Sequence, residues 1–112
     1  MSENLEQQKC TPCEGGTEPL DRDRVEKLLS QVPGWDVTDD GKKIVRKFEF
    51  KGFYKTMAFI NAMAWIANKE GHHPDFEAGY NYCTVHFMTH AIDGLSENDF
   101  ICAAKLNALL DD

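Results

Sequence analysis

Three of the four histidines lie in two short segments whose side chains could exchange protons with a substrate. Two are adjacent in the run Gly71-His72-His73-Pro74-Asp75, and a third follows in Met88-Thr89-His90-Ala91. Imidazole has an ordinary pKa of about 6.5, so a histidine can give and take protons near neutral pH. The residues between the two segments are typical of a tight β-hairpin, which would return His90 to the side of the adjacent pair. The sequence therefore predicts one pocket that contains three imidazole rings.

Three interpretations of this pocket stay open. In the first, the rings belong to loop histidines that are satisfied by local hydrogen bonds. In the second, three imidazoles hold a zinc ion with one open position, although adjacent histidines rarely point to one side and no His-x-His or His-x-x-x-His spacing occurs. In the third, which we favour, the rings are acid and base for a small substrate, and Asp93 or Asp99 orients one of them. No nucleophile arrangement accompanies them, so simple proton transfer is the expected chemistry.

Local signals predict the elements that position the histidines. Gly71 permits left-handed backbone angles and Pro74 disfavours a helical residue before it, so the adjacent pair is expected in a loop that leaves a helix. An extended piece at 75–79, a turn near Tyr80-Asn81 and an alternating strand form the hairpin. His86 lies on the polar face of that strand, and we interpret it as structural or solvent-facing.

Three helices and a further hairpin complete the predicted fold. Helices are expected behind the N-terminal signals Asp21 and Ser96 and, between them, over residues 53–70. Asp39-Asp40-Gly41 is an Asp-Gly connection that joins two antiparallel strands in a hairpin over residues 35–50. The order α-β-β-α-β-β-α predicts an α+β fold, with a four-stranded antiparallel sheet and three helices packed on one face.

The helix predicted over residues 53–70 is apolar around most of its circumference. Its main stripe consists of Phe53, Met57, Ile60, Ala64 and Ala67. A second stripe consists of Phe59, Met63 and Ile66. Such a helix lies in the core or also meets another subunit. Core burial is the favoured interpretation, and a homo-oligomer is expected to bury residues such as Phe59 and Met63.

Composition limits the classes of protein to consider. The length of 112 residues and 42% hydrophobic content suit a single domain, which we place at 20–112 behind a flexible arm of residues 1–19 that has little to bury. The formal charge of -7, with no basic block longer than Lys42-Lys43, argues against direct nucleic-acid binding. No apolar run approaches the roughly 18 residues of a membrane span, and the N-terminus lacks the pattern of a signal peptide. A cytoplasmic location is expected, without membrane contact.

The four cysteines fall into two groups. Cys83 and Cys102 lie within apolar periodic segments and are expected to be reduced core residues. Cys10 and Cys13 form a single Cys-Thr-Pro-Cys motif, which could supply half a zinc site or a redox disulfide. Because no second pair and no βαβ pattern accompanies this motif, we interpret it as part of the arm.

The histidine segments belong to a longer pattern that resembles a known family. Gly71-His72-His73-Pro74-Asp75-Phe76, then Tyr80-Asn81, Thr89-His90, Gly94-Leu95-Ser96 and Asp99, resembles the pterin-4a-carbinolamine dehydratases in their bacterial form. The resemblance runs from about Pro19 to Leu110. It implies dehydration of 4a-hydroxytetrahydropterin to quinonoid dihydropterin, a step that recycles the pterin used by an aromatic amino-acid hydroxylase such as phenylalanine hydroxylase. It also implies that no metal and no redox cofactor is required.

By position, the resemblance assigns roles to individual residues. His72, His73 and His90 become the catalytic histidines, with His72 and His90 as the leading acid–base pair, His73 as the residue that binds and orients the pterin, and Asp99 as the supporting carboxylate. The implied substrate-binding set is Gly71, His72, His73, Pro74, Phe76, Met88, Thr89, His90 and Ala91. Phe76 stands where many relatives carry tryptophan and preserves an apolar wall. Asn68 stands where animal relatives carry an acidic residue, so this chain departs from them at that helix position.

The same resemblance implies alternatives to an enzyme of pterin recycling. Animal relatives bind a homeodomain transcription factor through a helical surface, so an oligomeric interaction or coactivator module is one alternative. Pterin handling linked to molybdenum cofactor metabolism is another. For this acidic chain, the expected partners are the pterin substrate and further copies of itself, in a dimer or tetramer, with functional coupling to phenylalanine hydroxylase.

Overall fold

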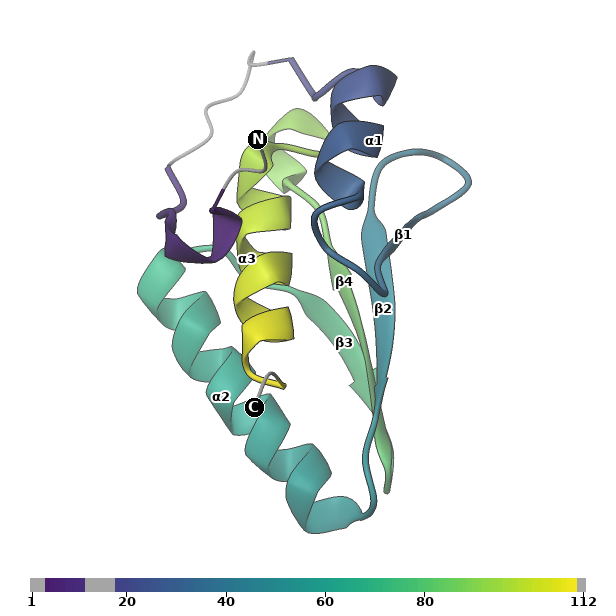
Figure 1. The fold of residues 1–112 in the computed structure, drawn as a ribbon, viewed down its shortest axis with the longest axis vertical. Coiled ribbons are helices and arrows are strands. Elements are labelled where there is room, and N and C mark those ends of the chain that lie inside the picture. Colours follow the sequence, from purple (N-terminus) through teal and green to yellow (C-terminus); the bar gives the residue numbers. More distant parts are fainter. Residues whose placement is uncertain (1–3, 12–17, 111–112) are drawn as a thin grey trace.

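The computed structural model describes residues 4–11 and 18–110, and within them it confirms the predicted α+β fold (Figure 1). Three α-helices are present: α1 (Arg22–Leu29), α2 (Phe53–Glu70) and α3 (Glu97–Ala108). Four strands form the sheet: β1 (Asp36–Val37), β2 (Ile44–Glu49), β3 (Asp75–Ala78) and β4 (Tyr82–Phe87). Two short 3-10 helices, η1 (Leu5–Gln7) and η2 (His90–Ile92), complete the list of elements.

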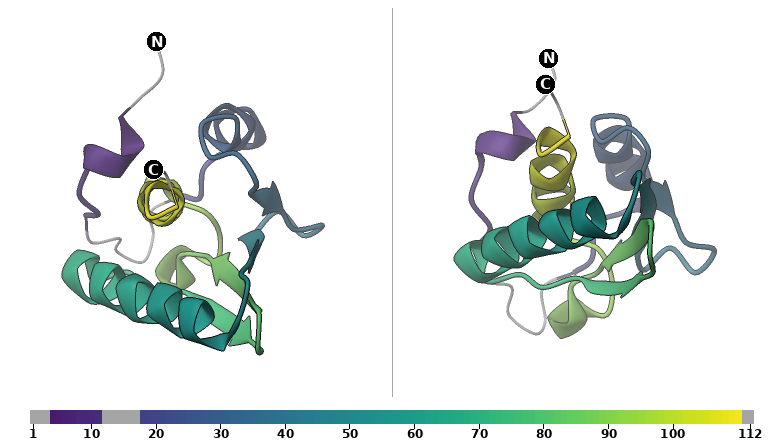
Figure 2. Two further views of the ribbon diagram at one scale, coloured as in Figure 1. Left: turned by 60° about the horizontal axis from the view of Figure 1, so that its bottom comes forward. Right: turned by 90° about the horizontal axis from the view of Figure 1, so that it is seen from below.

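The four strands form one antiparallel sheet in the order β1-β2-β4-β3. Each hairpin therefore contributes one inner strand and one edge strand, and β2 pairs with β4 across the centre, with Arg46 opposite Val85. The helices lie on one face of this sheet, and α3 lies between α1 and α2 (Figure 2). This arrangement places the beginning of β3 and the end of β4, which carry the two histidine segments, at the same end of the sheet.

The turns and caps form where the sequence signals predicted them. In the first hairpin, Gly41 has a φ of +73° and Thr38 donates its backbone N–H to the Lys43 carbonyl at 2.9 Å. The Asp21 carboxylate accepts the N–H of Arg24 at 2.9 Å and caps α1. In the second hairpin, Gly79 donates its N–H to the Tyr82 carbonyl at 3.0 Å.

The core lies between the sheet and the helices. Alternation in β4 buries Cys83, Val85 and Phe87 and leaves the intervening side chains on the open face of the sheet. The largest fully buried side chains come from both layers: Leu28, Val32, Ile44, Phe48, Met63, Val85, Phe87, Leu95, Phe100 and Leu106. His72 lies at the end of this core, because its ring stacks on Phe87.

The predicted orientation of α2 is wrong in part. The side chains that it buries are Thr56, Phe59, Met63 and Ala67, whereas Phe53 of the predicted main stripe is 56% exposed. Phe59 packs on Phe48 with ring centroids 4.5 Å apart, so Phe59 and Met63 are core residues of this chain and not its subunit contacts. Periodicity could not decide between the two stripes, because both repeat at helical spacing.

The prediction that the N-terminal arm has little to bury is wrong for residues 4–11. Leu5 is only 3% exposed and joins the hydrophobic core. Lys105 on α3 donates to the backbone carbonyl of Glu6 at 2.7 Å. A single leucine in a polar segment was a weak sequence signal, yet it fills a site beside α3. Cys13, and with it half of the Cys-Thr-Pro-Cys motif, lies outside the described residues.

None of the helices in the described part of the chain combines the length and hydropathy needed to cross a bilayer. Cys10, Cys83 and Cys102 are free thiols, and the latter two are fully buried. Burial raises the pKa of the Cys83 thiol. The pKa of the Cys102 thiol is raised as well, first by its hydrogen bond with Cys10 and then by burial.

These raised pKa values predict selective thiol chemistry. The reactive species is the thiolate. In the native protein at neutral pH, iodoacetamide should alkylate Cys10, whereas Cys83 and Cys102 should react at least about tenfold more slowly than they do in the protein unfolded by urea. Peptide mass spectrometry after timed labelling measures this selectivity. Equal labelling of Cys102 in the native and unfolded protein would contradict the predicted burial.

Candidate active site

The end of α2 fixes the place of the adjacent histidine pair. Gly71 adopts a left-handed conformation, with φ of +67°, and ends the helix. His72 then donates its backbone N–H to the Ala67 carbonyl at 3.2 Å, which ties the loop to the last helical turn. Because Pro74 starts the extended chain that leads into β3, the two histidine side chains are confined to this short connection.

Strand pairing brings the second histidine segment to the first. Asp75 at the start of β3 is opposite His86 in β4, so the residues after Phe87 run beside the loop that holds His72 and His73. Beyond β4, an isolated bridge joins Thr89 to Gly94 and encloses η2, which begins at His90. The predicted approach of the two segments follows from this register.

A cavity of about 490 Å³ lies between the two segments. Seven of the nine residues in the expected binding set line it: Gly71, His72, His73, Met88, Thr89, His90 and Ala91. The remaining lining residues are Cys10, Thr11, Glu70 and Asn98. This volume suits a small flat heterocycle, and three imidazole rings line it.

One imidazole that lines the cavity is bonded to a buried carboxylate behind the cavity wall. His72 Nε2 lies 2.6 Å from Asp99 Oδ1, and the His72 side chain is only 12% exposed while Asp99 is fully buried. With Asp99 as a carboxylate, which only accepts hydrogen bonds, the tautomer that fits this contact has its proton on Nε2 and leaves Nδ1 to accept one. The ring planes of His72 and Phe87 are 11° from parallel, with centroids 5.8 Å apart. Both contacts fix the orientation of the His72 ring.

Asp99 owes its position to the start of α3. Its Oδ2 atom accepts the backbone N–H of Ser96 at 2.9 Å, which is half of a capping box. The same oxygen accepts the Thr89 hydroxyl at 2.8 Å, and Thr89 also contacts the Ser96 hydroxyl at 2.7 Å. The carboxylate thus caps a helix, holds the strand that leads to His90 and orients His72.

The other two cavity histidines are held less firmly. His73 is exposed. The His90 side chain is 71% exposed, and its Nε2 atom lies 4.0 Å from Asp75 Oδ2. His90 therefore presents its ring at the solvent edge of the cavity, in contrast to His72, whose side chain is largely covered.

Several candidate residues lie elsewhere. Asp93 pairs with Lys42 at 2.7 Å on the surface, so Asp99 and not Asp93 is the carboxylate that contacts His72. Pro74 and Phe76 do not line the cavity, because β3 carries Phe76 away from the loop, and their contact with the substrate stays a prediction. His86 lies on the open face of the sheet, opposite Asp75. Among the described residues, no group of three or more histidine, cysteine or acidic side chains is placed to hold a metal ion.

Sequence reasoning missed four residues that line the cavity. Cys10 and Thr11 reach it because the N-terminal segment folds back along α3, a path that only Leu5 could have indicated. Asn98 lies two residues after Ser96, the capping residue of α3, and Glu70 immediately precedes Gly71. Polar residues at helix ends are common, so neither position had a distinctive sequence signal.

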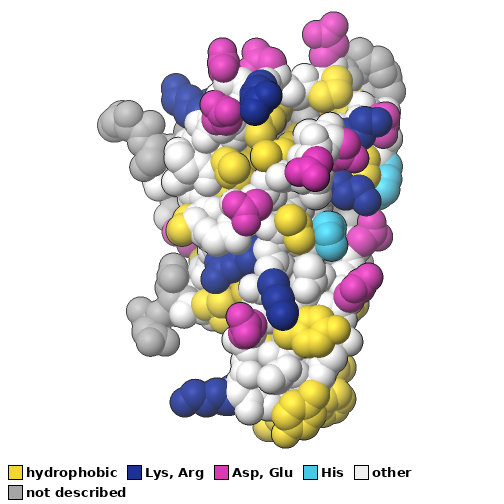
Figure 3. Space-filling model, turned by 90° about the vertical axis from the view of Figure 1, so that its right-hand side faces the viewer, with side chains coloured by type: hydrophobic (Ala, Val, Ile, Leu, Met, Phe, Trp, Pro, Cys, Tyr) yellow, Lys and Arg dark blue, Asp and Glu magenta, His cyan; other side chains and the backbone are white. Residues whose placement is uncertain are grey.

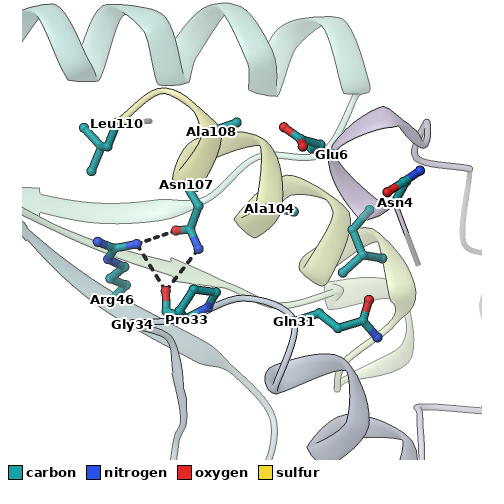
Figure 4. A pocket seen from close by; sticks show the side chains of 11 residues that line it. Asn4, Glu6, Gln31, Pro33, Gly34, Arg46, Ala104, Asn107, Ala108 and Leu110 are labelled. Atoms are coloured by element: carbon teal, nitrogen blue, oxygen red, sulfur yellow. Dashed lines mark hydrogen bonds between the residues drawn. The ribbon is translucent and has the colours of Figure 1, made fainter. Parts of the chain in front are cut away.

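A second cavity, of about 430 Å³, lies between η1, α3 and β2 (Figure 4). Three of its lining residues bond to one another: Arg46 and Asn107 both donate to the Pro33 carbonyl, and Arg46 also donates to the Asn107 side chain. Trp35 adds a hydrogen bond to Asn107 at 2.9 Å. This network joins the first hairpin to α3, and we interpret it as structural.

The chain is similar to known proteins over most of its length. The family described as pterin 4 alpha carbinolamine dehydratase matches residues 18–109. A Legionella pneumophila (strain Corby) chain whose name assigns it to the pterin-4-alpha-carbinolamine dehydratases is 56% identical over 113 residues, covering 100% of both chains. A Nitrosomonas europaea relative of the same name is also 56% identical, over 95% of this chain and 93% of its own.

Solved structures share the fold. The crystal structure of a transcriptional coactivator/pterin dehydratase from Brucella melitensis has a TM-score of 0.81 and 32% identity, covering 84% of this chain and 100% of its own. A pterin dehydratase-like protein identified as a RuBisCO assembly factor in the alpha-carboxysome has a TM-score of 0.60 at 23% identity, over 68% of this chain and 88% of its own. The second likeness concerns the fold alone.

Proposed function

Because this chain belongs to the pterin 4 alpha carbinolamine dehydratase family, we propose that it dehydrates 4a-hydroxytetrahydropterin to quinonoid dihydropterin by histidine acid–base catalysis. The observation that carries the proposal is the His72–Asp99 pair in a cavity that His73 and His90 also line. A buried carboxylate that fixes one imidazole beside two others is an arrangement suited to proton transfer.

The proposed reaction needs two proton transfers. The bond between carbon 4a and its hydroxyl oxygen breaks, a proton joins the departing hydroxyl to form water, and the adjacent ring N–H loses a proton as a carbon–nitrogen double bond forms. His72 and His90 share these transfers, and His73 binds and orients the pterin. The oxidation state of the system does not change, so we propose that no metal and no redox cofactor takes part.

The electrostatic role of Asp99 in this proposal is to stabilise the positive charge that His72 gains when it accepts a proton. A charge-assisted hydrogen bond of 2.6 Å in a nearly dry environment is stronger than the same contact in water. Asp99 keeps one tautomer of His72 in the resting site, with Nδ1 available as acceptor. Each such general acid or base contributes roughly 10²- to 10⁴-fold to a rate.

The direct test mixes the protein with freshly generated 4a-carbinolamine and follows the formation of quinonoid dihydropterin by absorbance. We expect a rate above that of buffer alone, and the same rate after dialysis against EDTA. No acceleration over buffer would refute the proposed activity, and a rate lost to EDTA and restored by a metal would refute the metal-free chemistry. A second pterin that differs at carbon 6 tests whether the site recognises more than the ring system.

We further propose a cytoplasmic role in recycling the pterin of an aromatic amino-acid hydroxylase. The free thiols of Cys10, Cys83 and Cys102 support a reducing compartment. Coupled turnover with phenylalanine hydroxylase, in which tyrosine formation is measured with and without this protein, tests the role. No increase in tyrosine formation would favour another use of the pterin.

The surface supports the proposal that the chain forms a homo-oligomer. On α2, Phe53 is 56% exposed, Tyr54 86% and Trp65 70%. Hydrophobic side chains gather at the end of the molecule where α2 begins (Figure 3), and Tyr80 stacks on Phe53 there. Exposed aromatic groups of this size are typical of subunit contacts.

Sedimentation should therefore show a dimer or tetramer at micromolar concentration. Trp65→Glu is expected to lower the mass towards that of the monomer, because it puts a charge into an apolar contact. Lys27→Glu, at an exposed position of α1, is the control and should leave the mass unchanged. A concentration-independent monomer of the unmodified protein would contradict the proposal.

A further inference from the structure

The N-terminal segment of residues 4–11 is held against the domain along its length. Leu5 is buried in the core, and the Glu6 carbonyl accepts a hydrogen bond from Lys105. The segment then passes to the cavity, where Cys10 lies with its Sγ atom 3.5 Å from that of Cys102. These contacts attach the segment to α3 along the length of the helix.

Two buried polar side chains hold the end of the segment at the cavity. The Glu70 side chain, 6% exposed, accepts the backbone N–H of Cys10 at 2.9 Å. Asn98, also 6% exposed, accepts the backbone N–H of Thr11 at 3.0 Å and donates to the Thr11 carbonyl at 2.6 Å. Burying polar groups is costly unless they find partners, and both side chains find partners in this segment.

The segment borders the same cavity as the histidines. Cys10 and Thr11 line it together with His72, His73 and His90. The match to the family begins only at residue 18, whereas the Legionella relative matches over the full length of both chains. The histidines therefore belong to the shared domain, and the segment is an addition that narrows the space in front of them.

We propose that residues 4–11 form a substrate-binding wall, in which Cys10 and Thr11 contact the bound pterin and Asn98 and Glu70 act as positioning residues. The inference rests on the proposed function, because it names the pterin as the occupant. The wall contributes binding surface and no proton transfer, so its loss raises KM much more than it lowers kcat.

The steady-state kinetics of two alanine variants, with their controls, test the proposed substrate-binding wall. Asn98→Ala removes both hydrogen bonds to Thr11, and we expect KM for the carbinolamine to rise about tenfold with kcat changed less than about threefold. Glu70→Ala should act in the same direction, while Glu70→Gln should restore KM because its amide oxygen still accepts from Cys10. Lys9→Ala, at an exposed position of the same segment, is the matched control. A KM within twofold of the unmodified protein for both alanine variants would overturn the proposal.

A second measurement does not depend on turnover. In a Cys13→Ser background, saturating 7,8-dihydrobiopterin should slow the alkylation of Cys10 by iodoacetamide at least about fivefold, because the bound pterin covers the thiol. An unchanged alkylation rate, at a dihydrobiopterin concentration that fluorescence titration shows to be saturating, would overturn the proposed substrate-binding wall. If the unmodified protein fails to accelerate dehydration, the proposed function falls, whereas the protection of Cys10 still decides whether a pterin lies against the segment.

Discussion

Replacing both His72 and His90 by alanine is expected to reduce the dehydration rate to that of buffer. In the proposed mechanism each ring supplies one of the two proton transfers, so removal of either alone should lower kcat roughly 10²- to 10⁴-fold. Stopped-flow measurement of quinonoid dihydropterin formation, at saturating substrate, checks the loss. The larger single effect is expected at His72, because Asp99 fixes its ring and its tautomer.

Two further variants make this result specific. His86→Ala removes a histidine from the open face of the sheet and should keep kcat within about twofold. His73→Ala should raise KM more than it lowers kcat, because His73 binds the pterin in the proposed mechanism. Full activity of the double variant would refute the assigned acid–base pair, and so would a loss at His86 as large as that at His72.

Asp99 is expected to couple the stability of the fold to the activity of the site. Asp99→Ala removes the capping bond to Ser96 and leaves Thr89 and His72 without their shared partner. Loss of a cap costs about 0.5–2 kcal/mol and each unsatisfied buried group about 1–3 kcal/mol, so we expect a loss of about 2–4 kcal/mol in the free energy of unfolding. Urea denaturation followed by circular dichroism measures it.

Asp99→Asn should separate the two roles. The amide oxygen can still accept from Ser96 and Thr89, so stability should fall by only about 1 kcal/mol. The amide nitrogen then faces His72 Nε2 as a donor, which forces the opposite tautomer and should lower kcat roughly 10²-fold. Asp93→Asn, at the surface carboxylate that pairs with Lys42, is the matched control for both measurements. An active Asp99→Asn protein would show that the tautomer of His72 does not matter.

Much of the fold was predictable because its signals are local. Asp39-Asp40-Gly41 makes a hairpin turn wherever alternating strands flank it, and Ser96 with Asp99 marks a helix start. The approach of His90 to His72 and His73 was also predictable, since a tight turn places the two outer ends of a hairpin side by side. These features depend on neighbours in the sequence, and the structure contains them where they were expected.

Other features depend on contacts between distant residues and could not be read from local patterns. The side of α2 that faces the core is decided by the packing of Phe59 on Phe48, not by periodicity. The path of the N-terminal segment depends on a site for Leu5 that exists only after α3 has docked on the sheet. Asp99 rather than Asp93 is the partner of His72, and its position likewise depends on a distant contact, the hydrogen bond from Thr89.

The stacking of His72 on Phe87 has a consequence for the timing of the proposed reaction. A ring held by a core phenylalanine and a buried carboxylate has lost its rotational freedom during folding, so its proton transfer requires no conformational search. His90 projects into solvent and must surrender rotamer entropy, about 0.5–1.5 kcal/mol, each time a substrate arrives. In the proposed mechanism, the fold therefore orients His72 before the substrate binds, whereas His90 becomes ordered only when the substrate binds.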